Sequence, residues 1–275
     1  MTERRTYQRN IIEETLKTIA QGLHTETDIY LIGGGAMTFY GRKAATKDID
    51  MVFTDAAPLQ RFQDAASEAG FKPVSEPEKE YRDIGAWVIL EDQRGLRLDL
   101  FHRQVCNALE FTETMKARAT HLTDLQLLHV HLAAPEDIVL FKGITERLTD
   151  LEDIRILAEA GVDWATVEEE CLTQRNSGRW ANLLLYKLDE LKTRYGIRPR
   201  VNRIRNHADK HVLEETFRQI LGDGELTFKE IQETIHRKTG YSEAWTRARL
   251  KQLEETGAIT TRKKNRRKLY RLTPN

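Results

Sequence analysis

The sequence predicts an α+β fold, in which a mixed sheet with helices is followed by a helical middle segment and a small C-terminal domain. Three observations predict it. Short strand-like segments alternate with amphipathic helices up to residue 160. The pattern from residue 164 to 221 is helical, and the composition turns basic after Gly222-Asp223-Gly224. We therefore expect domains at residues 1–162, 163–222 and 223–275.

The N-terminal elements follow from hydrophobic spacing and from glycine and proline positions. Asp48–Phe53 alternates as a strand, with Ile49, Met51 and Phe53 on one face and the two aspartates on the other. Pro135 is typical of the first turn of a helix. The expected helices are 6–23, 35–41, 58–70, 135–147 and 151–160, and the other expected strands are 28–32, 87–91, 95–101 and 127–132.

Bulk composition limits the class of protein. Of 275 residues, 40% are hydrophobic and 31% charged, which is typical of a globular protein. No apolar run approaches the roughly 20 residues of a membrane helix, and the N-terminus has no signal-peptide pattern. The two cysteines have no metal-ligand spacing. These features favour a cytoplasmic location and no membrane partner.

Three aspartates and a glycine turn are the candidate site. Asp48 and Asp50 share one strand face, and Asp99 lies on a later strand, so the three can converge on Mg²⁺ or Mn²⁺. Gly33-Gly34-Gly35 ends a strand and opens a helix, where backbone N–H groups can hold phosphate. Each feature alone is more often a tight turn or a solvated strand face. Together they indicate phosphoryl transfer.

These motifs resemble those of a known superfamily. The segments IGGGAM, GRKAATKDIDMVF and LRLDLF are similar to the DNA polymerase β-type nucleotidyltransferases, most closely to the minimal and abortive-infection-type prokaryotic members. The downstream stretch LAAPEDIVLFKGITERLTDLEDI resembles a later element of the same proteins. The resemblance covers roughly residues 28–160 and implies a nucleotidyltransferase-type mixed sheet.

The resemblance implies roles for individual residues. Asp48, Asp50 and Asp99 would be catalytic and bind the metal, while Gly33, Gly34 and Lys142 would bind the NTP substrate. Gly34 stands where many active members have serine, so one hydroxyl ligand is missing. Two interpretations stay open for the neighbouring charges. Arg42 and Lys47 could contact phosphate or balance the acids, and Arg147, Asp150 and Asp153 could form a surface ion-pair set.

The C-terminal segment is basic, with thirteen Lys or Arg and six Asp or Glu from Glu225 to Asn275. We expect helices at 229–238 and 243–256, with Thr227 and Glu230 forming a capping box, and strands at 258–261 and 268–272. This order resembles a winged helix-turn-helix domain, which implies nucleic-acid binding, DNA more than RNA. The expected contact residues are Arg247, Arg249, Lys251, Arg262, Lys263, Lys264, Arg266, Arg267 and Lys268. The alternative is a module that packs on the enzyme domain or on a protein partner.

Two functions follow. The first is a metal-dependent enzyme that transfers NMP from an NTP to an RNA or protein hydroxyl. The second is a DNA-binding transcriptional regulator or an antitoxin, whose nucleotidyltransferase fold senses a nucleotide or is inactive. A toxin–antitoxin partner or a homodimer fits either. For His129 and His131, which share a strand face, a structural role is favoured over a metal pair.

Overall fold

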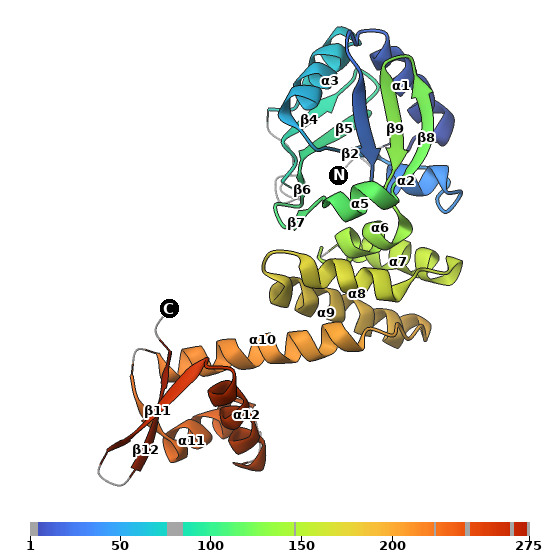
Figure 1. Ribbon diagram of the computed structural model, residues 1–275. Helices are drawn as coiled ribbons and strands as arrows, with labels where there is room; N and C mark the ends of the chain where they lie inside the picture. The colour runs from blue at the N-terminus through green and yellow to red at the C-terminus, as the bar shows by residue number, and fades with distance from the viewer. Residues whose placement is uncertain are drawn as a thin grey trace. The chain divides into compact units, whose positions relative to one another are not determined.

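The computed structural model describes residues 5–75, 85–145, 147–222, 224–239, 243–264 and 267–273 (Figure 1). Packing divides the chain into two compact units, Met1–Ile204 and Arg205–Asn275. The division falls inside helix α10 (Asn202–Leu221), earlier than the turn we expected after Gly222. The reason is that Phe217 and Leu221 belong to the hydrophobic core of the C-terminal unit.

The N-terminal unit contains a seven-stranded mixed sheet in the order β3-β4-β5-β2-β1-β9-β8. Strands β2 and β5 are parallel, as are β1 and β9, and the other neighbouring strands are antiparallel. The prediction of a mixed sheet is confirmed. The strands are β1 (Thr27–Leu31), β2 (Asp48–Phe53), β3 (Lys72–Pro73), β4 (Val88–Glu91), β5 (Arg97–His102), β8 (Thr120–Leu125) and β9 (Leu128–Leu132).

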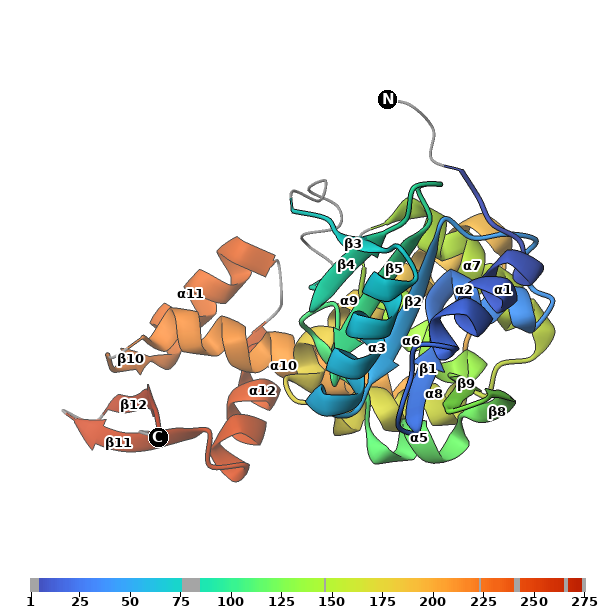
Figure 2. The same ribbon diagram turned by 90° about the horizontal axis from the view of Figure 1, so that it is seen from above.

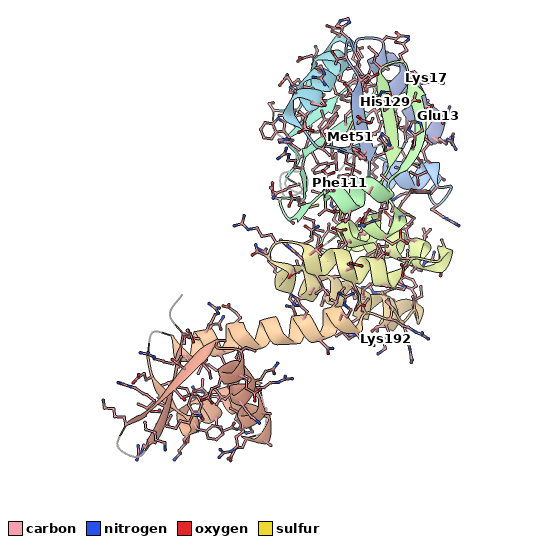
Figure 3. All side chains as sticks on the ribbon, viewed as in Figure 1. Glu13, Lys17, Met51, Phe111, His129 and Lys192 are labelled. Atoms are coloured by element: carbon pink, nitrogen blue, oxygen red, sulfur yellow. The ribbon has the colours of Figure 1, made fainter. Side chains whose placement is uncertain are left out.

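Helices α1 (Arg9–Ala20) and α3 (Ala56–Glu68) pack side by side on one face of the sheet (Figure 2). The rings of Phe53 and Phe62 meet there with centroids 5.3 Å apart. Figure 3 shows Met51 inside the unit, whereas Glu13 and Lys17 lie on the outer side of α1. The apolar face of β2 is therefore used for packing, which leaves its aspartate face for the opposite side.

Helices on the other side of the sheet are α5 (Glu113–Arg118), α6 (Pro135–Gly143), α7 (Leu148–Ala160), α8 (Trp164–Thr173) and α9 (Ser177–Tyr195). The short helix α2 (Gly33–Phe39) links β1 to the loop before β2. Our prediction of one helix over 135–147 was wrong at its C-terminal end. Helix α6 ends at Gly143, where an added Cβ would lie 2.3 Å from Leu184 Cδ1, so α6 and α9 approach closely only with glycine there.

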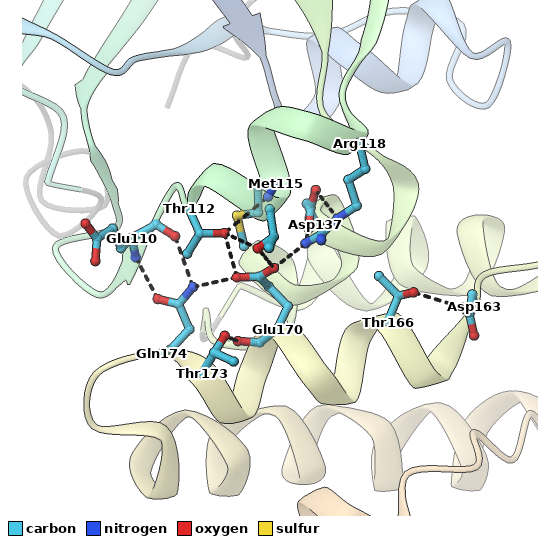
Figure 4. A network of polar contacts seen from close by, with 11 residues as sticks. Glu110, Thr112, Met115, Arg118, Asp137, Asp163, Thr166, Glu170, Thr173 and Gln174 are labelled. Carbon is cyan, nitrogen blue, oxygen red and sulfur yellow. Dashed lines mark hydrogen bonds and ion pairs between the residues drawn. The ribbon is translucent and has the colours of Figure 1, made fainter.

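A buried polar network joins α5, α6 and α8 (Figure 4). Arg118 forms ion pairs with Asp137 and, at 2.6 Å, with Glu170. Thr112 and Thr114 donate hydrogen bonds to the two carboxylate oxygens of Glu170, at 2.8 and 2.7 Å. Both carboxylates are almost fully buried, and each has a cationic partner. The network therefore fixes the helices beneath the sheet.

The C-terminal unit has a three-stranded antiparallel sheet in the order β10-β12-β11, packed with helices. The elements after α10 are β10 (Leu226–Thr227), α11 (Phe228–Thr239), α12 (Glu243–Glu255), β11 (Ile259–Lys264) and β12 (Arg267–Leu272). The capping box is confirmed, since Glu230 accepts a hydrogen bond from the backbone N–H of Thr227 at 2.7 Å, and the Thr227 hydroxyl accepts one from the N–H of Glu230 at 3.4 Å. In the described parts of both units, no helix is long and apolar enough to cross a membrane.

Candidate active site

The three aspartates lie on one face of neighbouring parallel strands. Asp50 on β2 and Asp99 on β5 are directly paired, and Asp48 is paired with Arg97. Because residues two apart on a strand share a face, Asp48, Asp50, Arg97 and Asp99 all lie on the side away from α3. The sequence pattern predicted this alignment through the spacing of the acids, but it did not predict the buried Arg97, which donates a hydrogen bond to Glu91 at 2.5 Å.

The glycine turn lies directly against this row. Gly33 has a φ of +57°, and a Cβ added to it would lie 2.5 Å from Oδ2 of Asp50. Only glycine therefore allows the backbone at the start of α2 to approach the carboxylate so closely. The first N–H groups of a helix have no acceptor within the helix. The turn thus presents backbone donors next to the aspartates.

Gly34 is tightly enclosed by the loop before β2. A Cβ added there would lie 2.5 Å from the hydroxyl oxygen of Thr46 and 3.8 Å from Nζ of Lys43. Thr46 is buried and donates a hydrogen bond to the backbone carbonyl of Asp48 at 3.0 Å. The space that a serine side chain would need at position 34 is therefore filled by a hydroxyl from position 46.

Electrostatics set the aspartates apart from ordinary surface acids. Burial, and secondly the charge of Asp48, raise the pKa of Asp50 to about 6. Oδ1 of Asp48 and both carboxylate oxygens of Asp99 are shielded from solvent. Holding these charges together costs free energy that a cation would offset. Within the described ranges, no group of three or more His, Cys, Asp or Glu side chains is placed so that it could hold a metal ion.

Lys142 lies in a second row of charges facing the aspartates from α6 and α7. Its ammonium contacts Asp150 at 2.7 Å and Asp153 at 2.8 Å, and both carboxylates are buried. Burial is the largest single influence on the pKa of Lys142 and lowers it. The charges and hydrogen bonds of the two carboxylates together outweigh burial, so the pKa is raised. Asp150 and Asp153 do form ion pairs, but the pairs are buried and their partners are Lys142 and Lys43, so the interpretation as a surface ion-pair set was wrong.

Lys43 is the residue that sequence reasoning missed. Its Nζ contacts both oxygens of Asp153, at 2.9 and 2.8 Å, and the same atom lies beside Gly34. It therefore connects the glycine turn to α7 across 110 residues of sequence. The sequence analysis named Arg42 and Lys47 as the cations that flank the acids, and both are exposed. Lys43 is the third cation of the segment GRKAATKDID, and its position there is the only hint of its role that the sequence offered.

The histidines of β9 have carboxylate partners. His129 Nδ1 lies 2.7 Å from Asp124, and His131 Nε2 lies 2.9 Å from Asp28. The hydrogen bond with Asp124 raises the pKa of His129. Ring stacking with Tyr30, at 4.9 Å between centroids, also holds His131 in place. These contacts agree with the structural role that the sequence favoured.

The predicted nucleic-acid residues lie on α12 and on the β11–β12 hairpin, apart from Arg266, which is outside the described residues. Several have acidic partners: Arg247 contacts Glu243 at 2.7 Å, Arg262 contacts Glu225 at 2.5 Å and Lys268 contacts Glu254 at 2.8 Å. Further along α12, Lys251 lies 3.7 Å from Glu255 and Arg249 donates a hydrogen bond to Gln252. Cations also face each other across the hairpin, as Lys263 with Lys268 and Lys264 with Arg267.

Comparison with known families agrees with this geometry. Residues 10–195 match the family described as "Nucleotidyltransferase of unknown function (DUF6036)". The match covers more than half of the chain, so the protein belongs to this family of nucleotidyltransferases. A search of curated proteins finds no match to the chain.

Proposed function

We propose that the protein is a metal-dependent nucleotidyltransferase that transfers NMP from an NTP to a hydroxyl group of an acceptor. The observation that carries the proposal is the direct pairing of Asp50 with Asp99 on the strand face that also bears Asp48. The donor set fits a hard divalent cation, because all three side chains offer carboxylate oxygens. The close approach of Gly33 to Asp50 brings the backbone N–H groups at the start of α2 next to these carboxylates, where they could bind phosphate.

The chain's own groups have distinct tasks in this reaction. The acceptor hydroxyl oxygen bonds to the α-phosphorus, the bond between that phosphorus and the oxygen bridging to the β-phosphate breaks, and pyrophosphate leaves. We assign the hydroxyl proton to Asp99, the most deeply buried of the three acids. Gly33 and Gly34 hold the triphosphate through backbone N–H groups. Lys43, beside Gly34, and Lys142, which shares Asp153 with it, add positive charge near the phosphates. Mg²⁺ or Mn²⁺, when bound, would align the reacting groups and neutralise the leaving group.

A label-transfer experiment tests the proposal. Each α-labelled NTP is incubated with the full chain, Mg²⁺ or Mn²⁺, and total RNA or protein as acceptor. Labelled product is expected with the wild type and is expected to disappear in the double variant Asp48→Ala/Asp50→Ala. Transfer that persists in the double variant would contradict the assigned metal site.

For the C-terminal unit, we propose a winged-helix domain that binds nucleic acid, with DNA favoured over RNA. The element order and the strand order β10-β12-β11 support it. Like charges directly opposite each other destabilise a hairpin, so the Lys263–Lys268 and Lys264–Arg267 pairs favour a polyanion as ligand. The variant Lys263→Ala/Lys264→Ala should bind DNA more weakly and lower the slope of log K against log salt by about 2. An unchanged slope would exclude the hairpin from the interface.

A second candidate function uses the same two units in another way. The chain would be a DNA-binding regulator or antitoxin, and the nucleotidyltransferase fold would bind a nucleotide without turnover. The observation that favours it is the enclosure of Gly34 by Thr46, since that position has no hydroxyl of its own. NTP binding with tight, sequence-specific DNA binding, but no transfer to any acceptor, would favour this function.

A further inference from the structure

A cavity of about 530 Å³ lies beyond the carboxylate row, at the end of β5. It lies between the β6–β7 hairpin (Gln104–Val105 and Leu109–Glu110) and the turn joining α8 to α9. The catalytic assignment above does not use it. It is lined by residues from the end of β5, the hairpin, the α8–α9 turn and the start of α9, among them His102, Arg103, Arg175 and Trp180.

Buried hydrogen bonds fix both walls of this cavity. The amide of Gln174, which is only 5% exposed, accepts from the backbone N–H of Glu110 at 2.8 Å and donates to its carbonyl at 3.0 Å. The hairpin is thereby attached to the end of α8, as Figure 4 shows. On the opposite wall, Trp180 donates from Nε1 to the carbonyl of Arg175 at 2.7 Å. Hydrogen bonds therefore hold both walls of the cavity in place.

Backbone conformation is unusual around the same cavity. Among the described residues, five that are not glycine have a positive φ, and three of them, Arg103, Asn107 and Asn176, line the cavity. A fourth, Cys106, is at the tip of the hairpin. Such conformations are costly and concentrate where ligands bind. The side chain of Arg103 is also held by a hydrogen bond that its Nε donates to the carbonyl of Thr54 at 2.7 Å.

The chemistry of the lining favours a nucleotide. Apart from Ala108, each lining residue has a hydrogen-bonding side chain. Of the two lining arginines, Arg103 also pairs with Asp55 at 3.3 Å, so Arg175 is the main candidate for a phosphate contact. Trp87 is 66% exposed and its ring lies 5.6 Å from that of His102, so an aromatic face borders the cavity. Arginines hold phosphate, and exposed aromatic rings stack with unpaired bases. The volume also suits one nucleotide.

The cavity is close enough to the aspartates to serve the same reaction. Cys106, beside the lining residue Asn107, is within electrostatic range of Asp50 and Lys142. His102 is three residues beyond Asp99 on β5, about 10 Å along the strand, but its side chain starts from the opposite face, so the approach to the aspartates is made by the hairpin wall. A nucleotide bound here would therefore have its neighbouring sugar near the metal-binding face.

We propose that this cavity binds the terminal nucleotide of a single-stranded nucleic-acid acceptor. The inference rests on the proposed transferase function, because it names the acceptor class of that reaction. A protein acceptor is less suited, since nearly every residue that lines the cavity has a hydrogen-bonding side chain.

Photocrosslinking tests the assignment without requiring turnover. The full chain is mixed with an RNA oligonucleotide carrying 4-thiouridine at its 3′ end or a DNA oligonucleotide carrying 4-thiothymidine there, irradiated, and digested for mass spectrometry. We expect crosslinks on residues 102–110 or 174–180, and the more efficient oligonucleotide identifies the acceptor. Trp87→Ala and Arg175→Ala should each lower the crosslink yield about tenfold. The controls Tyr186→Ala and Arg198→Ala change exposed residues of the same unit outside the cavity and should leave it unchanged.

The outcomes separate the two proposals. Crosslinks confined to residues 259–272 would overturn the cavity assignment, because the C-terminal hairpin would then be the whole contact. Equal yields in all four variants would overturn it as well. Label transfer to protein in the absence of crosslinks would overturn the nucleic-acid acceptor while the transferase function stands. Crosslinks in the cavity without any label transfer would support the binding site and contradict the transferase function.

Discussion

Two groups of acids in the N-terminal unit, one buried and one partly buried, differ in the charges that surround them. In the Arg118 network, the guanidinium lies between Asp137 and Glu170. In the carboxylate row, Asp50 is directly paired with Asp99, and Asp48 is on the same face. Burial raises the pKa of both Asp50 and Asp137 to about 6, but the charge of Asp48 adds to this effect at Asp50, whereas Arg118 opposes it at Asp137. One group therefore stabilises the fold, and the other favours the arrival of a cation.

The largest expected effect is on catalysis. Asp50→Asn should lower label transfer by about 10³-fold or more, because a neutral amide cannot take part in binding the divalent cation. Asp64→Asn, an exposed change on α3, should leave transfer unchanged. In metal-free buffer, Asp50→Asn should also unfold at higher urea concentration than the wild type, since a repulsion is removed. A loss of stability would contradict the contrast between the two groups.

The next largest effect is on stability, with the opposite sign. Arg118→Met should lower the free energy of unfolding by about 3–5 kcal/mol, because it leaves two buried carboxylates without their guanidinium. Arg155→Met is the matched control. Both side chains are 25% exposed, but the partners of Arg155, Glu152 and Glu159, lie at the surface. Its cost in urea unfolding should be much smaller than that of Arg118→Met, because both partners are exposed, and equal costs would contradict the distinction.

A smaller effect concerns the glycine turn. Gly34→Ser should cost about 1–3 kcal/mol, because its Cβ would collide with the Thr46 hydroxyl. The double variant Gly34→Ser/Thr46→Ala should recover part of that cost, as thermal unfolding can measure. Gly35→Ala, whose Cβ would meet its nearest neighbours at 3.9 Å, is the control for lost backbone freedom. A double variant no more stable than Gly34→Ser alone would show that Thr46 does not fill the space.

The smallest effect is a dependence on pH. The pKa of Asp137 is about 6 in the folded chain, above its ordinary value, so the folded state binds this proton more tightly than the unfolded state. Asp137 should therefore add about 1 kcal/mol to the free energy of unfolding as pH falls from 7 to 5. The pKa of Glu170 is lowered, so its own contribution is lost only at more acidic pH. Comparing urea unfolding of the wild type and Asp137→Asn at both pH values isolates the effect, and identical pH dependence would disprove it.

Much of the local structure was predictable from the sequence. The Asp48–Phe53 strand and the start of α6 at Pro135 lie where hydrophobic alternation and proline placed them. The shared face of Asp48 and Asp50 followed from the same alternation, whereas the position of Asp99 depends on how β5 pairs with β2 and could not be read from either strand alone. The roles of these residues in metal and nucleotide binding stay predictions.

The missed features depend on contacts between distant residues. Lys43 reaches Asp153, and Arg118 reaches Glu170, through tertiary packing that no local pattern encodes. The segments that form β8, α5 and the β6–β7 hairpin were not predicted at all. Two of them are short, and β8 is largely polar, so periodicity gives them little signal. The close approach of α6 to α9 at Gly143 also required the three-dimensional packing.

The position of Cys106 makes the reactivity of its thiol depend on charges in the carboxylate row. Cys171 is fully buried, while Cys106 is partly exposed at the hairpin tip. The pKa of Cys106 is raised to about 12, mainly by burial, while Arg147 and Lys142 lower it and Asp50 is among the charges that raise it. Neutralising Asp50 would therefore favour the thiolate, which is the reactive form. The rate at which this natural thiol is alkylated should therefore rise when Asp50 is neutralised, without an engineered cysteine.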